Sequence, residues 1–221
     1  MPGSLRAAYD ESFVNIREDV LRLTDMVDQA IDLAWQSLRE RDQDLAQQII
    51  EDDEKVNDLR FDIEEACLKL IATQQPTATD LRAVIAAMNV VVDLERMGDY
   101  AAGIAKTVIR MGDEPLLKPL VDIPRMVEIA RDMLQEALRA YSDRDPAMAK
   151  EVAARDDEID RLYKSIFDEL VEIMAENPEG VTRATYLLWV AHNLERIGDR
   201  VTNIAERVVF VTTGDMKELN D

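Results

Sequence analysis

The sequence has very little cysteine and histidine, with one residue of each among 221. The single cysteine, Cys67, excludes an intramolecular disulfide framework. Because Cys67 falls on an apolar helical stripe, we expect it to be a buried and unreactive thiol. The only histidine, His192, has no second histidine to pair with. We therefore expect His192 to be a structural residue rather than a metal ligand.

Glycine and proline are also scarce, with seven of each, and few of them interrupt the periodic stretches. Together with abundant alanine, leucine, glutamate, aspartate and arginine, this scarcity indicates long helices. The sequence contains no uninterrupted run of about 18 apolar residues, the length that a membrane-spanning helix needs. No signal peptide opens it, so we expect a cytoplasmic protein.

Basic residues are few relative to acidic ones. The chain has 26 Lys and Arg against 46 Asp and Glu, which gives a formal net charge of −20 at pH 7. Both halves of the chain have an excess of acidic residues, so neither half is a basic domain. A charge of this sign and size disfavours direct binding to nucleic acid or to anionic membranes. It favours cations and basic partner surfaces.

Apolar residues recur at steps of three and four along six long stretches, and this period predicts amphipathic helices. The expected helices cover residues 5–41, 45–73, 78–111, 124–141, 146–176 and 181–213. Proline and glycine gather in residues 112–124, which predicts a boundary between an N-terminal domain (1–112) and a C-terminal domain (118–221). Since short turns force neighbouring helices to be antiparallel, the expected fold is all-α, with two tandem, pseudo-symmetric three-helix bundles.

Two helix starts carry sequence signals of their own. Asp145 before Pro146 is typical of an N-cap followed by proline at the first helical position. Thr77 and Asp80 have the spacing of a capping box, with Asp in place of the usual Glu. We expect both segments to begin helices.

The strongest motif is an internal repeat. Asp93–Asp99 has the sequence Asp-Leu-Glu-Arg-Met-Gly-Asp, and Asn193–Asp199 has the sequence Asn-Leu-Glu-Arg-Ile-Gly-Asp. Each copy is followed five residues later by Ile-Ala. The similarity continues upstream, where residues 53–59 align with residues 156–162. We interpret these recurrences as an internal duplication.

Each repeat carries pairs of oxygen-bearing side chains at positions i and i+4, on one helix face beside the apolar stripe. Two carboxylates at this spacing repel one another, so their recurrence in both halves indicates a bound cation. Facing carboxylates on adjacent helices also form the di-metal sites of helical bundles. An all-oxygen ligand set suits Mg, Mn, Ca or a hard iron state and disfavours a structural zinc. The candidate ligands are Asp53, Asn57, Glu95 and Asp99 in one half, and Asp156, Asp160, Glu195 and Asp199 in the other.

The two halves differ at one ligand position. Asn57 is neutral where the second half has Asp160, so we expect the first site to bind metal more weakly. Gly98 and Gly198 lie inside both motifs, although glycine lowers helix stability by roughly 1 kcal/mol relative to alanine. A glycine inside a helix often marks the close approach of another element.

Polar residues around the motifs leave several roles open. Arg96 and Arg196, which follow the motif glutamates, either neutralise the carboxylates in ion pairs or hold an anion near the metal. Asn203 lies one turn after the second motif and could add a ligand, whereas its counterpart Gly103 cannot. A solvated acidic face without metal remains the alternative for all four pairs.

At these motifs the chain resembles the PhoU family, the phosphate-signalling regulators of bacteria and archaea. The resemblance covers nearly the whole length and also rests on Gln74-Gln75-Pro76, Asp80-Leu81-Arg82 and Asn203-Ile204-Ala205-Glu206. It implies two similar three-helix bundles, often in a homodimer. It also implies multinuclear metal sites, with Fe, Mn or Mg as the candidate metals, at the eight candidate ligands given above.

The resemblance implies a regulatory function rather than catalysis. A family member of this kind negatively regulates phosphate uptake and the phosphate regulon. It acts through the phosphate ABC transporter, chiefly the ATPase subunit, and through a membrane sensor histidine kinase. Two alternatives remain open: a helical scaffold or chaperone-like protein without metal, and a di-metal carboxylate enzyme. The enzyme would need two Glu-x-x-His pairs, which His192 alone does not supply.

Overall fold

The computed structural model describes residues 2–215 and 218–219, with side chains from residue 6 onward. Within this part of the chain there are seven α-helices, one 3-10 turn and no strand, so the predicted all-α class is confirmed. The elements are α1 (Pro2–Glu40), α2 (Gln43–Gln74), α3 (Thr79–Met111), α4 (Asp122–Asp143), α5 (Pro146–Ala153), α6 (Asp156–Glu176), η1 (Pro178–Gly180) and α7 (Val181–Thr213).

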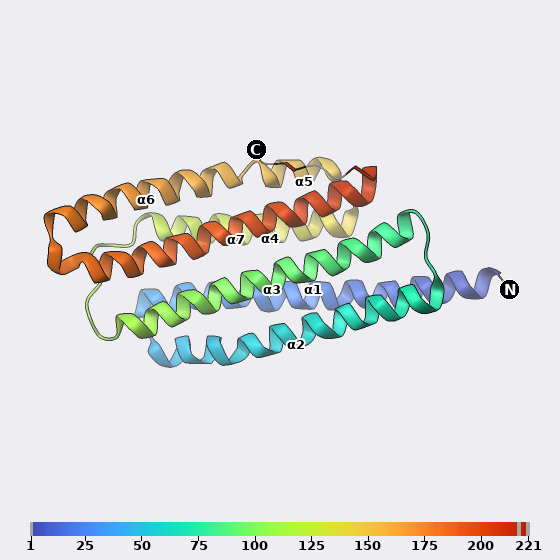
Figure 1. Cartoon of the computed structure of the whole chain (residues 1–221), viewed down its shortest axis with the longest axis horizontal. Coiled ribbons are helices and arrows are strands. Elements are labelled where there is room, and N and C mark those ends of the chain that lie inside the picture. Colours follow the sequence, from blue (N-terminus) through green and yellow to red (C-terminus); the bar gives the residue numbers. More distant parts are fainter. Residues whose placement is uncertain (1, 216–217, 220–221) are drawn as a thin grey trace.

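The helices form two groups that lie against each other. Figure 1 shows α1, α2 and α3 in one group and α4 to α7 in the other, with α3 and α7 side by side along the middle. One hydrophobic core contains residues from all seven helices and runs through both groups. Because this core is shared, the structure does not divide the chain sharply, and the domain boundaries 1–112 and 118–221 stay a prediction.

The expectation of a single helix over residues 146–176 is wrong. The helix ends at Ala153, and a new one begins at Asp156. At the junction the Arg155 N–H donates to the carbonyl of Val152 at 3.0 Å, three residues back, which tightens the turn and interrupts the α-helical ladder. The acidic residues 156–158 then lie in the first turn of α6, where the helix dipole favours negative charge.

The two predicted helix starts have different outcomes. The Asp145 side chain accepts hydrogen bonds from the backbone N–H groups of Ala147 and Met148, so the predicted N-cap is confirmed. The capping box at Thr77 and Asp80 is wrong, because no side chain caps the first turn of α3. Asp80 instead forms an ion pair with Arg6 on α1.

The structure also bears on the single cysteine and on the lack of long apolar runs. Cys67 is fully buried, as expected, and burial raises the pKa of its thiol to about 12, which favours the unreactive protonated form. Among the residues that the structure describes, no helix is both long enough and apolar enough to cross a membrane.

Candidate metal-binding carboxylates

The motif glycines set how closely the upstream aspartates approach the motif helices. A Cβ added to Gly98 on α3 would lie 3.2 Å from Oδ1 of Asp53 on α2. A Cβ added to Gly198 on α7 would lie 2.5 Å from Oδ1 of Asp156 on α6. Each aspartate therefore rests against the backbone of the motif helix in its own half. The close approach that the glycines predict is confirmed.

Replacing Gly198 by alanine is expected to destabilise the chain more than replacing Gly98. The added methyl group would overlap Asp156 and approach Cδ1 of Ile159 at 3.0 Å. Overpacking of this kind costs about 1–3 kcal/mol, while alanine returns about 1 kcal/mol of helix propensity. Urea unfolding of the two variants measures the difference. Equal stability of Gly98→Ala and Gly198→Ala would contradict this account of the packing.

In the N-terminal half, α3 supplies a buried and a half-exposed carboxylate. Glu95 is 6% exposed, and its Oε2 accepts no hydrogen bond. Arg96 donates from Nη1 to Oδ2 of Asp99 at 2.8 Å, and its Nε lies 3.5 Å from Glu95 Oε2. On α2, the side-chain amide of Asn57 donates to the backbone carbonyl of Asp53 at 3.1 Å. The ion-pair alternative for Arg96 is the one that the structure supports.

The C-terminal half repeats this arrangement with one addition. Glu195 on α7 has a buried Oε2 that accepts no hydrogen bond and lies 3.3 Å from Nδ1 of His192. The His192 ring also contacts the ring of Tyr163, with centroids 5.9 Å apart. Nε of Arg196 lies 3.6 Å from Oδ2 of Asp199, so the ion-pair alternative holds here too.

The upstream carboxylates of the C-terminal half lie in different environments. Asp156 is 4% exposed and rests against Gly198, whereas Asp160, one turn further along α6, is exposed. Asp160 nevertheless lies within electrostatic reach of both Glu195 and Asp199. The structure therefore brings Asp160 toward the motif pair on α7.

The crowding of the candidate carboxylates raises the pKa of several of them. Burial is the largest cause of a raised pKa at four of the candidate ligands, and the charge of the motif aspartate comes second. Asp99 acts on Asp53 and Glu95, and Asp199 acts on Asp160 and Glu195. A nearby positive ion would stabilise the ionised carboxylates against both desolvation and mutual repulsion. This environment therefore suits a cation.

The metal-free protein is expected to gain stability as the pH falls from 7 toward 4.5. The raised pKa of each carboxyl group means that the folded state binds protons more tightly than the unfolded chain does. Stability therefore rises as the pH falls through the folded pKa, and the gain is complete below the ordinary values of 3.8 for Asp and 4.5 for Glu. Chemical unfolding across this range in EDTA measures the effect. The variant Asp160→Asn/Glu195→Gln should show a smaller rise.

The carboxylates lie near one another but do not form a complete set of metal ligands. Within residues 2–215 and 218–219, no three His, Cys, Asp or Glu side chains converge closely enough to hold a metal ion. The buried, hydrogen-bond-free oxygens of Glu95 and Glu195 still fit a hard cation, which carboxylate oxygens bind readily. The two metal sites, with four candidate ligands in each half, therefore remain a prediction, supported by the type and crowding of the residues.

The structure adds an ion pair between a buried aspartate and a partly exposed arginine that the sequence reasoning missed. Asp93 on α3 is 7% exposed and accepts hydrogen bonds from two residues of α7, Nη1 of Arg200 at 3.3 Å and Nδ2 of Asn203 at 3.1 Å. Asn203 is thus engaged with Asp93 through its Nδ2, and the expectation that it could add a metal ligand stays a prediction. The signal in the sequence was a charged residue at the head of the first motif where the second copy has Asn193.

A known family model matches both halves of the chain, each of which contains one copy of the motif. The PhoU domain, as defined by its family model, matches residues 20–108 and 123–208, two segments that together cover most of the chain. The chain belongs to the PhoU family. The expectation drawn from the repeated motifs is therefore confirmed at the level of the family.

PhoU relatives match along nearly the full length. A phosphate-specific transport system accessory protein PhoU homolog of Clostridium acetobutylicum is 37% identical over 217 residues, which cover 98% of this chain and 99% of the relative. A protein of the same description from Aquifex aeolicus is 37% identical, and the match covers 90% of each chain.

Two solved PhoU structures are similar in three dimensions. The crystal structure of PhoU from Pseudomonas aeruginosa has a TM-score of 0.90 and 34% sequence identity, and the match covers 94% of this chain and all of the other. The phosphate transport system regulatory protein PhoU from Streptococcus pneumoniae gives a TM-score of 0.89 at 31% identity, covering 95% and 99%. The PhoU fold thus extends over both halves of the chain.

Proposed function

We propose that this protein regulates phosphate transport. The supporting observation is the match of the PhoU domain to both halves, together with relatives that are described as accessory proteins of the phosphate-specific transport system. The paired helical groups and the acidic surface suit a protein that works by binding partners. In this proposal the chain is a regulator and not an enzyme.

The finer proposal is negative regulation through two partners in the cytoplasm. The chain would restrain phosphate uptake by contacting the ATPase subunit of the phosphate ABC transporter, and restrain the phosphate regulon by contacting the sensor histidine kinase. The net charge of −20 favours a basic surface on at least one of these partners. The chain would act as a homodimer, without inserting into the membrane or binding nucleic acid.

Metal binding is part of the same proposal. Glu195, Asp199, Asp156 and Asp160 would hold a hard cation such as Mn, Mg or iron in the C-terminal half. Asp53, Asn57, Glu95 and Asp99 would hold a weaker site in the N-terminal half. A bound cation would neutralise crowded carboxylates and so join α2 to α3 and α6 to α7.

Deleting the gene and following a phosphate-regulon reporter tests the regulatory proposal. Without the protein, the reporter is expected to be expressed even in phosphate-rich medium, and the wild-type gene supplied in trans should restore repression. Normal repression in the deletion strain would overturn the proposal. Co-purification of the chain with the ATPase subunit and with the kinase tests each partner separately, with added salt expected to weaken the contact of an acidic surface with a basic one.

A further inference from the structure

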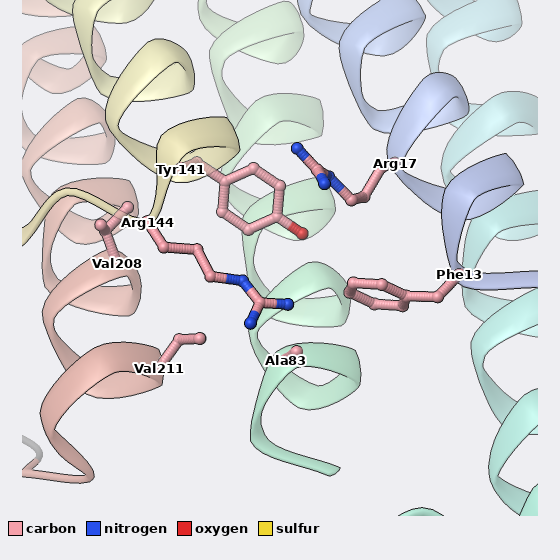
Figure 2. Close-up of a pocket in the computed structure, with 7 residues that line it drawn as sticks. All are labelled: Phe13, Arg17, Ala83, Tyr141, Arg144, Val208 and Val211. Atoms are coloured by element: carbon pink, nitrogen blue, oxygen red, sulfur yellow. The ribbon is translucent and has the colours of Figure 1, made fainter. Parts of the chain in front are cut away.

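A pocket between the two helical groups lies away from the motif carboxylates. It encloses about 20 Å³, opens to solvent, and lies where the N-terminal part of α1 meets the C-terminal ends of α4 and α7 and the start of α3. Figure 2 shows its lining residues, which are Phe13, Arg17, Ala83, Tyr141, Arg144, Val208 and Val211.

Three hydrogen-bond donors converge on this pocket. The hydroxyl group of Tyr141 points into the space between the guanidinium groups of Arg17 and Arg144, with the ring of Phe13 on the far side (Figure 2). Arg17 uses Nη2 to donate to the backbone carbonyl of Ser142 at 2.9 Å, which holds its guanidinium beside the pocket. The Tyr141 hydroxyl is buried and has no hydrogen-bond partner.

Positive charge is uncompensated at this place in an otherwise acidic protein. No carboxylate lines the pocket. Within the described part of the chain, neither Arg17 nor Arg144 has an Asp or Glu within ion-pair distance. The nearby carboxylate of Asp145 is used as the N-cap of α5. A chain with net charge −20 therefore keeps two cations together without an internal carboxylate partner.

The surroundings strengthen the attraction for an anion. Phe13, Ala83, Val208 and Val211 form an apolar wall, and electrostatic interactions beside such a wall are less screened than in water. Burial raises the pKa of Tyr141, so its hydroxyl keeps its proton at neutral pH and can donate a hydrogen bond. Arg144 is exposed and stands at the solvent side, where an ion from solution would enter.

We propose that the pocket binds a small inorganic oxyanion, with Arg17, Arg144 and the Tyr141 hydroxyl donating hydrogen bonds to its oxygens. Planar guanidinium groups match the oxygens of phosphate and similar anions, and charge-assisted hydrogen bonds are stronger than neutral ones. The site is separate from the carboxylate pairs and does not depend on the regulatory proposal. Because Arg17 belongs to α1, and Tyr141 and Arg144 to the α4 end, a bound anion would hold the two helical groups together.

Inorganic phosphate is the probe for this site. Line broadening in ³¹P NMR and isothermal titration with the full chain, at ionic strength held constant with chloride, should show one saturable site. Sulfate should displace phosphate, whereas chloride should not, because the site is built for oxygen atoms. Anionic lipid vesicles should not compete, since the site is for a free ion; competition by vesicles would overturn that assignment.

Two variants and one matched control decide the assignment. Arg144→Gln and Tyr141→Phe should each weaken phosphate binding, the former by roughly tenfold or more, as expected for a lost hydrogen bond to a charged group. Arg41→Gln is the control, because Arg41 occupies the same left-handed position in the turn between α1 and α2 (φ 56° against 54°) and does not line the pocket. Absence of phosphate binding, or binding that both pocket variants leave unchanged, would overturn the proposal.

Discussion

Replacing Glu195 by Gln and Asp199 by Asn is expected to abolish the stabilisation that Mn²⁺ gives to the folded chain. At a metal concentration of 100 times Kd, binding to the folded state alone adds about 2.7 kcal/mol to the free energy of unfolding. For a chain of this size this corresponds to about 5–10 °C in Tm. The metal-free variant should be as stable as the wild type or slightly more stable, because the amides remove the repulsion. Thermal unfolding with Mn²⁺ and with EDTA measures both effects.

Two further variants show whether the effect belongs to the C-terminal motif. Glu95→Gln/Asp99→Asn should lose less of the stabilisation, because Asn57 already weakens the first site. Asp58→Asn/Asp62→Asn removes an exposed i, i+4 pair from α2 with the same change of charge, and it should leave the metal effect intact.

One result would contradict metal binding at the C-terminal motif. If the Glu195/Asp199 variant binds Mn²⁺ with the affinity and stoichiometry of the wild type, the motif is a solvated acidic face. The chain would then act as a helical interaction protein without a metal at this place.

Replacing Arg200 by Met is expected to destabilise the folded chain. It would leave the carboxylate of Asp93 buried between α3 and α7 with only Asn203 as a donor. Leaving a buried acceptor without its donor costs about 1–3 kcal/mol. The larger cost of breaking a fully buried ion pair does not apply, because the Arg200 side chain is 25% exposed. Urea unfolding measures the loss.

An exposed arginine and a double variant serve as controls for this prediction. Arg22→Met, at a side chain that is 67% exposed, should change stability by no more than about 0.5 kcal/mol. Adding Asp93→Asn to Arg200→Met should recover part of the loss, since the uncompensated charge is then gone. A loss at Arg200 as small as at Arg22 would show that Asp93 is well solvated without its partner.

The sequence predicted the features that depend on local periodicity and on repetition. The apolar steps of three and four predicted long amphipathic helices, and the leucines inside the two motifs, Leu94 and Leu194, are buried in such helices. The break at Ala154 and Arg155 escaped prediction, because the apolar steps continue on both sides and only the backbone shows the tight turn. The repeat located the carboxylate pairs, whereas their spacing along the helices could not show how far the facing oxygens lie from one another.

Contacts between segments far apart in the sequence could not be predicted for a different reason. Asp93 and Arg200 lie in opposite halves, and nothing in either helix pattern shows which residues of α3 meet which residues of α7. The same holds for Arg17 and Tyr141, which come together only because α1 packs against α4.

The contact between α3 and α7 has the form of an isologous interface whose two-fold symmetry is broken. On one side Asp93 meets Asn203, while at the equivalent place on the other side Asn193 meets Gly103. Two copies of the first half would oppose Asp93 with Gly103, which has no side chain to donate. Two copies of the second half would crowd Asn193 against Asn203. These side chains therefore favour the pairing of one half with the other over the pairing of two like halves.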